Sequence, residues 1–231
     1  MFFPWVGMFE QIRLADTYVH YSDVPFSKGS FVNRVQVKTA QGTPWMTVPL
    51  KSFSIGRSIC EVEIDDQKDW RRKHREMLAQ AYAHAPFMED MLKIVDGVYS
   101  RRYDNIDELS KASIRSVCEF LGLDKERRFL DIRDLHIAGS GSQRVLDTVQ
   151  ALEGKSYTTG LGARNYLRHE LFEQADIRVN YMDYEKTPYA QLHGDFTPFV
   201  SILDLIANTG RESSGYITSG TIYWKEYVEN G

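Results

Sequence analysis

The sequence predicts an α/β protein with a mixed sheet, antiparallel in its N-terminal part and built of parallel βαβ units in its last third, flanked by helices. Three observations predict this class. Apolar and polar residues alternate on both sides of a glycine turn at 41–44, which is typical of a hairpin. Apolar residues recur at three- and four-residue steps over 69–122, which indicates helices. After residue 128, strand-like and helix-like stretches alternate, as in βαβ units.

The chain of 231 residues fits one domain, with the helical stretch 69–122 as an insertion, because α/β domains of this size commonly share one core. Hydrophobic residues make up 42% and charged residues 26%, the usual globular mixture. The net charge of −4 offers no general attraction to nucleic acid or an anionic membrane. No apolar run suits a membrane helix, and the start lacks a secretory signal. We therefore expect a cytoplasmic protein without nucleic-acid partners or membrane insertion.

The two cysteines, Cys60 and Cys118, lie far apart and in unrelated contexts. We expect buried or part-buried thiols in a reducing compartment. No set of His, Cys and Asp has a metal-ligand spacing, so no metal is expected. A Gly-x-Ser-x-Gly elbow is also missing, and no covalent mechanism is indicated.

The first elements are a helix over 7–15 and a strand over 17–21. The Phe-Phe-Pro-Trp start resembles the end of a strand, so the first strand is expected to be shortened. The runs 35–38, 45–50 and 59–64 alternate in character and predict three antiparallel strands.

Helical periodicity then predicts a helix from Asp69 to Arg102 that is interrupted at Pro86, and another over 106–121 that ends at Gly122. The order expected for the last third is strand 129–135, helix 142–152, strand 156–159, helix 163–175 and strand 177–184. A final helix over 199–208 is entered through Pro198 and stopped by Gly210. The Ser/Gly/Thr-rich tail beyond Arg211 is expected to fray.

The first candidate site is the loop that contains Asp23, Lys28, Asn33 and Arg34. Lys28 and Arg34 would hold a phosphate or carboxylate, Arg34 in a bidentate manner, while Asp23 accepts from an amine or hydroxyl. The alternative is a solvated loop with a local ion pair.

A second candidate follows Trp70, where five cationic or titratable residues occupy 71–75. His74 shares a helix face with Trp70 and Leu78, so it points inward, whereas Lys73 meets water. His74 is either a hydrogen-bonded core residue or a catalytic base.

Two glycine turns precede helices. The turn at 139–144 could surround an anion with backbone N–H groups, but Ser142 equally suits an ordinary N-cap. The turn that contains Gly160, Asn165 and Tyr166 follows a strand, at the edge where open parallel sheets collect ligands. Its glycines could also serve only close packing.

The last candidate segment carries Tyr189, Gln191 and His193 and leads to Asp204. Apolar residues surround Asp204, so this carboxylate is expected to be at least partly buried and to need a partner. A structural network and a role in binding a substrate amine are both open.

These segments occur in an order that resembles the WbqC-like family over nearly the whole length. The segments that carry the resemblance are Phe3-Pro4-Trp5-Val6-Gly7, Asp23 to Lys28, Asn33-Arg34, Trp45 to Pro49, Trp70 with Lys73-His74, the Tyr166-Leu167 pair after a glycine turn, and Gln191 through Asp204. Members of the family usually carry a Gln-Pro pair before the Pro-Trp-x-Gly run, whereas this chain begins inside that region.

The resemblance implies a role in bacterial O-antigen and lipopolysaccharide gene clusters, as a transferase that attaches an acyl or aminoacyl unit, such as glycyl, to an amino-sugar nucleotide. His74 or His193 would act as base and Asp204 as orienting acid. The implied partners are the sugar nucleotide and an acyl or aminoacyl carrier protein, whose thioester would be the donor, with no cofactor identified. Two alternatives remain open: a non-catalytic protein that binds the sugar nucleotide or the carrier, and a nucleotidyltransferase-like enzyme, although the latter's His-x-Gly-His sequence is missing.

Overall fold

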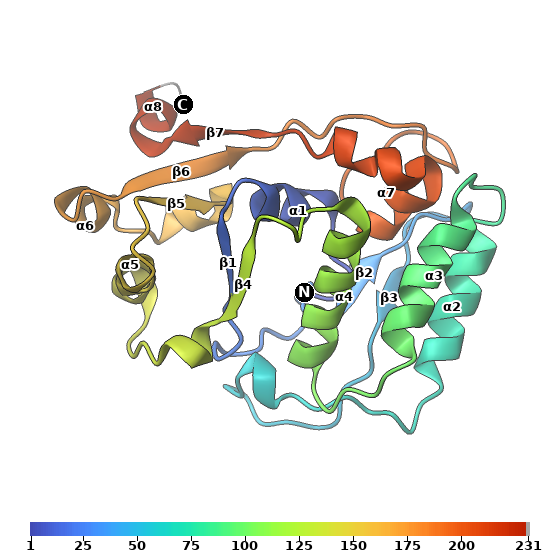
Figure 1. The fold of residues 1–231 in the computed structure, drawn as a ribbon. Coiled ribbons are helices and arrows are strands. Elements are labelled where there is room, and N and C mark those ends of the chain that lie inside the picture. Colours follow the sequence, from blue (N-terminus) through green and yellow to red (C-terminus); the bar gives the residue numbers. More distant parts are fainter. Residues whose placement is uncertain (230–231) are drawn as a thin grey trace. The chain divides into compact units, whose positions relative to one another are not determined.

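The computed structural model describes residues 1–229, which form two compact units. Unit 1 consists of Met1–Phe9, Ser22–Glu126 and Lys186–Ile217, and unit 2 of Glu10–Tyr21, Arg127–Glu185 and the segment from Thr218 onward. The described residues contain eight α-helices, and their strands form both parallel and antiparallel pairs. The predicted α/β class with a mixed sheet arrangement is therefore confirmed (Figure 1).

Unit 1 contains the predicted hairpin. Strand β2 (Arg34–Gln36) pairs antiparallel with β3 (Trp45–Thr47). The chain reverses at Gly42, whose φ of 115° favours glycine. Val35 and Met46 oppose each other and are buried, so the alternation seen in the sequence reflects one face packed on the core.

The third antiparallel strand predicted over 59–64 is wrong. Ile59–Glu61 forms a 3-10 helix, η1, and only an isolated bridge between Leu50 and Ile64 remains of the predicted pairing. The cause is local, because the Glu61 carboxylate accepts from the backbone N–H of Ser58 at 3.0 Å and so turns the chain. The alternation of apolar and polar residues does not by itself reveal such a capping box.

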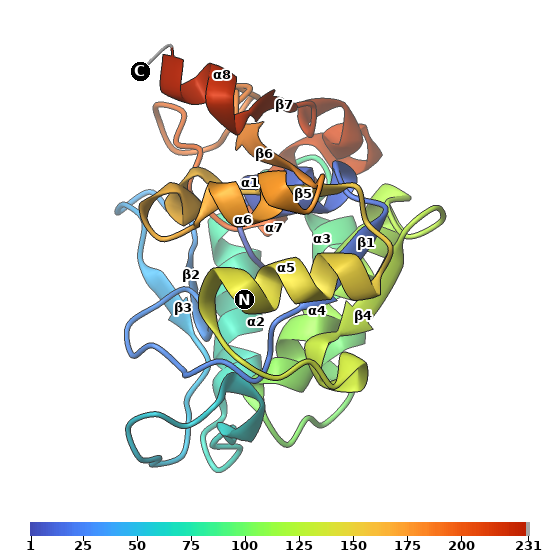
Figure 2. The same ribbon diagram turned by 90° about the vertical axis from the view of Figure 1, so that its left-hand side faces the viewer.

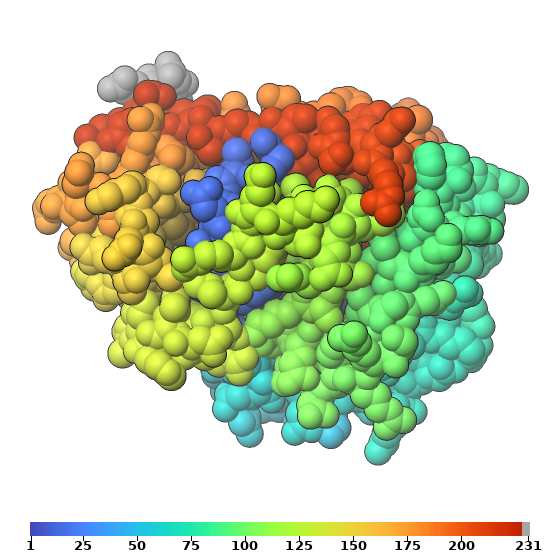
Figure 3. Space-filling model, in the orientation of Figure 1, coloured from blue at the N-terminus to red at the C-terminus, as the bar shows by residue number. Residues whose placement is uncertain are grey.

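The helices of unit 1 agree with the predicted periodicity. They are α2 (Trp70–Ala81), α3 (Met88–Tyr99), α4 (Ile106–Leu121) and α7 (Ile202–Thr209), followed by the 3-10 segment η4 (Gly210–Tyr216). The interruption at Pro86 separates α2 from α3 as expected. Helix α3 packs against α2, α4 and α7, and Figure 3 shows the outer face of α3 and α4 in green.

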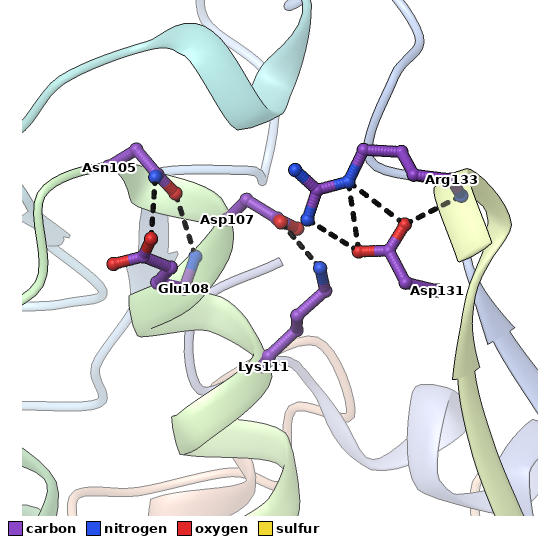
Figure 4. A network of polar contacts seen from close by, with 6 residues as sticks. All are labelled: Asn105, Asp107, Glu108, Lys111, Asp131 and Arg133. Atoms are coloured by element: carbon purple, nitrogen blue, oxygen red, sulfur yellow. Dashed lines mark hydrogen bonds and ion pairs between the residues drawn. The ribbon is translucent and has the colours of Figure 1, made fainter.

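Helix α4 is delimited by residues that the sequence already marks. The Asn105 side chain accepts from the backbone N–H of Glu108 at 3.0 Å and donates to its carboxylate at 3.0 Å (Figure 4). Asp107 and Lys111 then pair at 2.5 Å across one helical turn. Gly122 closes the helix in the left-handed region.

Unit 2 contains two groups of strands. Strand β1 (Thr17–His20) pairs in parallel with β4 (Arg128–Asp131) and is reached through α1 (Val6–Arg13), the helix within which the boundary between the units falls. Strands β5 (Ser156–Thr159), β6 (Arg178–Asp183) and β7 (Gly220–Tyr223) form a sheet in which β5 and β6 are parallel and β7 is antiparallel. The predicted parallel pairing is confirmed.

In unit 2, two helices pack on this sheet and share a hydrophobic core with it. Helix α5 (Gly141–Ala151) and helix α6 (His169–Gln174) lie beside β5 and β6 (Figure 2). Leu146 of α5, Phe172 of α6 and Val179 of β6 belong to one buried cluster. The βαβ rhythm in the sequence therefore reflects helices that bury their apolar face on a sheet.

The strand predicted over 129–135 is too long. It ends at Asp131, whose carboxylate accepts from the backbone N–H of Arg133 at 2.9 Å and pairs with the Arg133 guanidinium at 2.7 Å (Figure 4). An acid that binds the backbone two residues ahead turns the chain. Ile132–Leu135 accordingly forms the 3-10 helix η2.

The helix predicted over 163–175 is split into η3 (Leu161–Asn165) and α6. Ser142 binds the intervening segment, because its hydroxyl donates to the carbonyl of Tyr166 at 3.3 Å and accepts from the N–H of Arg168 at 2.9 Å. The N-cap role expected for Ser142 is therefore wrong, and Ser140 is the N-cap residue of α5.

The frayed tail predicted beyond Arg211 is wrong for the residues that the structure describes. After η4, the chain forms β7 and then α8 (Trp224–Glu229). Its polar residues are used in both units. In unit 1 the Ser213 hydroxyl donates to the carbonyl of Gly210 at 2.5 Å, and in unit 2 the Tyr223 hydroxyl and the Trp224 indole donate to the Glu173 carboxylate at 2.6 and 2.8 Å. The polar side chains of this tail therefore form hydrogen bonds within the fold, and their presence does not indicate fraying.

Candidate functional site

A basic pocket of about 420 Å³ lies in unit 1 and collects several residues predicted from the loop at 23–34. Its lining includes three cationic side chains, from Lys28, Arg34 and Lys51. The other lining residues are Phe26, Gly29, Asn33, Thr47, Val48, Pro49, Leu50, Ser52 and Phe53. Asp23 does not line the pocket; its backbone carbonyl accepts from the Ser58 hydroxyl at 3.1 Å. Of the four residues predicted together, the structure thus brings Lys28, Asn33 and Arg34 to the pocket and leaves Asp23 outside its lining.

Arg34 is held in position from two sides. One terminal nitrogen of its guanidinium donates to the carbonyl of Gly29, and the group lies 4.3 Å from the ring centroid of Trp45. Such stacking suits a planar delocalised cation. The Nε of Arg34 is buried and has no hydrogen-bond partner among the described residues. The guanidinium is therefore preoriented while part of its donor capacity remains unused.

The other two cations differ in their surroundings. Lys28 is exposed and has no ion-pair partner in the described part of the chain, whereas Lys51 lies 2.5 Å from the Glu63 carboxylate. Both side chains of that pair are more than half exposed, so water screens it. Lys51 was missed by the sequence reasoning, because a single Lys after a Pro-Leu pair carries no pattern.

Asn33 shapes the pocket. Its side-chain amide donates to the carbonyl of Val48 at 2.9 Å, and its own carbonyl accepts from the N–H of Val48 at 2.8 Å. These bonds extend the β2–β3 ladder by one position. One pocket wall is aromatic, because Phe26 and Phe53 meet edge to face with their ring centroids 5.2 Å apart.

The carboxylate of Asp204, on α7, forms the centre of a buried network elsewhere in unit 1. It accepts from the hydroxyls of Tyr82 and Tyr189 at 3.0 and 2.8 Å and from the amide of Gln191 at 2.8 Å. Burial raises the pKa of Asp204, and these hydrogen bonds oppose the rise. The expectation that Asp204 is buried and partnered is confirmed, and Tyr189 and Gln191 are brought to it.

Lys38 extends this network and was not singled out from the sequence. Its ammonium donates to the side-chain oxygen of Gln191 at 2.8 Å and to the carbonyls of Gly194 and Asp195 at 3.2 and 2.5 Å. Lys38 is buried, yet it ends a run of alternating residues in which a Lys would be expected to face water. The network fixes the segment between Tyr189 and Asp195.

His74 lies inside unit 1, as its position on the helix predicted. Its Nε2 donates to the carbonyl of Thr47 at 3.0 Å, since a carbonyl only accepts, so the neutral ring accepts from the Tyr99 hydroxyl at Nδ1, also at 3.0 Å. Burial lowers the pKa of His74 to about 4, against the opposing effect of the Thr47 carbonyl. Both nitrogens are therefore engaged in the fold. Lys73 lies exposed on the same helix, away from the basic pocket.

His193 differs from His74 in its accessibility. It is exposed, has a φ of 65°, and its Nε2 donates to the carbonyl of Ala81 at 2.7 Å. Within the described residues its Nδ1 has no hydrogen-bond partner. This ring nitrogen is therefore not used by the described fold, although His193 lies within the segment that Lys38 holds.

The glycine turn predicted as a ligand site belongs to unit 2. Gly160 directly follows β5, and a Cβ at this position would lie 3.3 Å from the amide nitrogen of Gln11. Asn165 and Tyr166 are exposed in η3 and at its end. The turn does follow the carboxyl end of a parallel strand, and the lining of the basic pocket comes from other residues, all of them in unit 1.

Unit 2 also contains a buried acid that sequence reasoning missed. Glu10 of α1 is fully buried; one carboxylate oxygen accepts from the Ser219 hydroxyl, and the other has no partner among residues 1–229. Burial raises the pKa of Glu10. The adjacent Arg13 donates to the carbonyl of Ser219. The helical pattern over 7–15 did not indicate that the acid at position 10 faces inward.

Among the described residues, no group of three or more His, Cys, Asp or Glu side chains could hold a metal ion. Cys60 is part-buried and Cys118 is buried, both as free thiols, which confirms their predicted burial. In the described chain no helix combines the length and the apolar character needed to cross a membrane.

Comparisons with known proteins agree with the order of motifs. The uncharacterised protein Rv1507c of Mycobacterium tuberculosis is 29% identical over 218 residues, which cover 94% of each chain. No solved structure matches the chain. The model of the WbqC-like protein family matches residues 1–216, a span that includes the basic pocket and the Asp204 network. The chain belongs to the WbqC-like protein family.

Proposed function

We propose that the chain binds an amino-sugar nucleotide in the basic pocket and transfers an acyl or aminoacyl group, such as glycyl, to its amine in surface-polysaccharide (O-antigen) biosynthesis. The observation that carries the proposal is the grouping of Lys28, Arg34 and Lys51 around one pocket of about 420 Å³. Family membership supports the choice of pathway by resemblance.

The electrostatics favour a phosphorylated ligand. The chain is acidic overall, with a net charge of −4, so attraction to an anion must come from a local grouping of cations. Arg34 offers a planar fork that suits two phosphate oxygens, and Lys28 adds a point charge. The pocket volume lies within the range of about 300 to 1,000 Å³ that is usual for small-molecule sites.

The transfer needs a base. The amine nitrogen attacks the carbonyl carbon of an acyl or aminoacyl thioester, the C–N bond forms and the C–S bond breaks, and the proton lost by the amine passes through the base to the leaving thiolate. We assign this role to His193, since its Nδ1 lacks a partner among the described residues, whereas both nitrogens of His74 are engaged.

A short backbone segment connects the basic pocket to the residue that holds the His193 segment. Lys38, which holds Gly194 and Asp195, follows Arg34 by four residues along an extended segment. At roughly 3.3 Å per residue this spacing is about 13 Å. A ligand whose diphosphate binds Arg34 would have to extend along this segment to bring its amine to His193.

A charge reversal tests the binding step. We expect Lys28→Glu to weaken the binding of an amino-sugar nucleotide by about tenfold or more at low salt, and less at high salt, because salt screens exposed charges. Isothermal titration calorimetry measures this change. The control is Lys93→Glu, which makes the same charge change at an exposed lysine on α3 outside the pocket. Equal effects of the two variants, or no binding by the unaltered protein, would contradict the proposal.

Turnover separates the transferase from a second candidate, a non-catalytic protein that binds the sugar nucleotide or the carrier. The complete engagement of His74 favours that candidate. Mass spectrometry of the acceptor with a thioester donor would detect the added group. For a transferase, His193→Ala should lower the rate about hundredfold or more while binding is kept. Tight binding without product in the unaltered protein would support the non-catalytic role.

A further inference from the structure

Two aromatic side chains remain exposed beside the basic pocket, and we call them the aromatic platform. They are Phe31, which is 49% exposed, and Trp45, which is 39% exposed at the start of β3. Their ring centroids are 5.5 Å apart and the rings are tilted by 55°. Two large apolar rings that contact each other at the protein surface, and not in the core, indicate a surface that a ligand covers.

Arg34 makes the platform continuous with the pocket. The guanidinium lines the pocket and also lies 4.3 Å from the ring centroid of Trp45. A phosphate that binds Arg34 is therefore separated from the platform by one side chain. The part of a ligand attached to that phosphate would lie against the two rings.

We infer that the aromatic platform receives the nucleobase of a nucleoside diphosphate whose phosphates occupy the basic pocket. This inference rests on the proposed function and specifies its substrate class. Every nucleobase has a flat π-face, so aromatic rings bind bases by stacking with little preference among them. The platform thus selects nucleotide-linked ligands over simple phosphates, and leaves the choice of base to other groups.

Two probes that share the diphosphate and differ in the nucleoside test the inference. In isothermal titrations, the unaltered protein should bind uridine diphosphate more tightly than inorganic pyrophosphate. Phe31→Ala should weaken the binding of uridine diphosphate by about tenfold and change that of pyrophosphate by less than about twofold. Trp45→Phe keeps a ring over Arg34 and should retain most of the preference.

The matched control is Phe87→Ala, which removes a ring of similar exposure, 38%, in unit 1 outside the pocket. It should bind both probes as the unaltered protein does. If neither uridine diphosphate nor pyrophosphate binds the unaltered protein, the proposed function and this inference both fail. If pyrophosphate binds but uridine diphosphate binds no tighter, or Phe31→Ala weakens both probes equally or no more than Phe87→Ala, the inference alone is overturned.

Discussion

His74 shows how single residues acquire their properties from partners that lie far away in the sequence. The helical spacing from Trp70 to Leu78 predicted that this ring faces inward, and it does. Its two partners, Thr47 and Tyr99, belong to a strand and to another helix, and no local pattern connects them. The direction of a side chain was thus predictable from periodicity, whereas its tautomer and its low pKa depend on tertiary contacts.

The low pKa of His74 makes stability depend on pH. The folded-state pKa of about 4 lies below the ordinary value of 6.5, so the unfolded chain takes up the proton first as the pH falls. The stabilisation is complete above pH 6.5 and is lost as the pH falls towards 4. Between about pH 7.5 and about pH 4.5 this residue should account for a loss of about 2 to 3 kcal/mol in the free energy of unfolding.

Urea unfolding at both pH values measures this loss. His74→Gln keeps a donor and an acceptor but does not titrate, so its pH dependence should be smaller than that of the unaltered protein by this amount. The matched control is His84→Gln, which makes the same substitution at an exposed histidine. A His74→Gln variant with the full dependence would show that other groups cause the acid lability.

At the scale of elements, boundaries were predictable where a side chain near the end marks them by its type. Pro86 and Gly122 separate or end helices as expected. The failures at 59–64 and 129–135 share one cause, since Glu61 and Asp131 each bind a backbone N–H a few residues away and turn an apparently regular strand. Alternation reports which side chains face the core, and it is insensitive to such local hydrogen bonds.

The end of α7 depends on a glycine. Gly210 has φ 58° and ψ −132°, and a Cβ there would lie 2.6 Å from the ring of Phe87. Gly210→Ala should therefore lower the free energy of unfolding by about 2 to 4 kcal/mol, from backbone strain and overpacking together. Thermal or urea unfolding measures the change. Gly215→Ala, in η4, meets nothing within 4 Å and should cost less than about 1 kcal/mol; equal losses would argue against the steric cause.

At the scale of the whole molecule, the motifs and their order were sufficient to recognise the family, and the loop at 23–34 supplied three lining residues of the basic pocket. The remainder of that pocket and the Asp204 network required the fold. Lys51 and Lys38 reach their sites through pairings between segments that are distant in sequence. Residue type alone does not encode such proximity.

A shortened chain tests the contribution of the C-terminal segment to unit 2. A protein that ends at Ile217 lacks β7, and it also lacks Ser219, which donates to the buried Glu10 carboxylate. We expect unit 2 to lose protection from amide hydrogen exchange in β6, because its outer edge becomes unpaired and a buried acid loses its donor. Helices α2 to α4 of unit 1 serve as the internal control. Unchanged protection in β6 would contradict this expectation.

Each unit is assembled from three separated stretches of the chain, and this interleaving has a consequence for biosynthesis. Unit 1 lacks α7 until the ribosome has passed residue 209, and unit 2 lacks β7 until it has passed residue 223. Neither unit can complete its fold until its last stretch has been synthesised, although domains generally fold as units and in N-terminal order. Both units therefore carry incomplete apolar surfaces while the intervening stretches are being synthesised, and chaperones can bind these surfaces during that period.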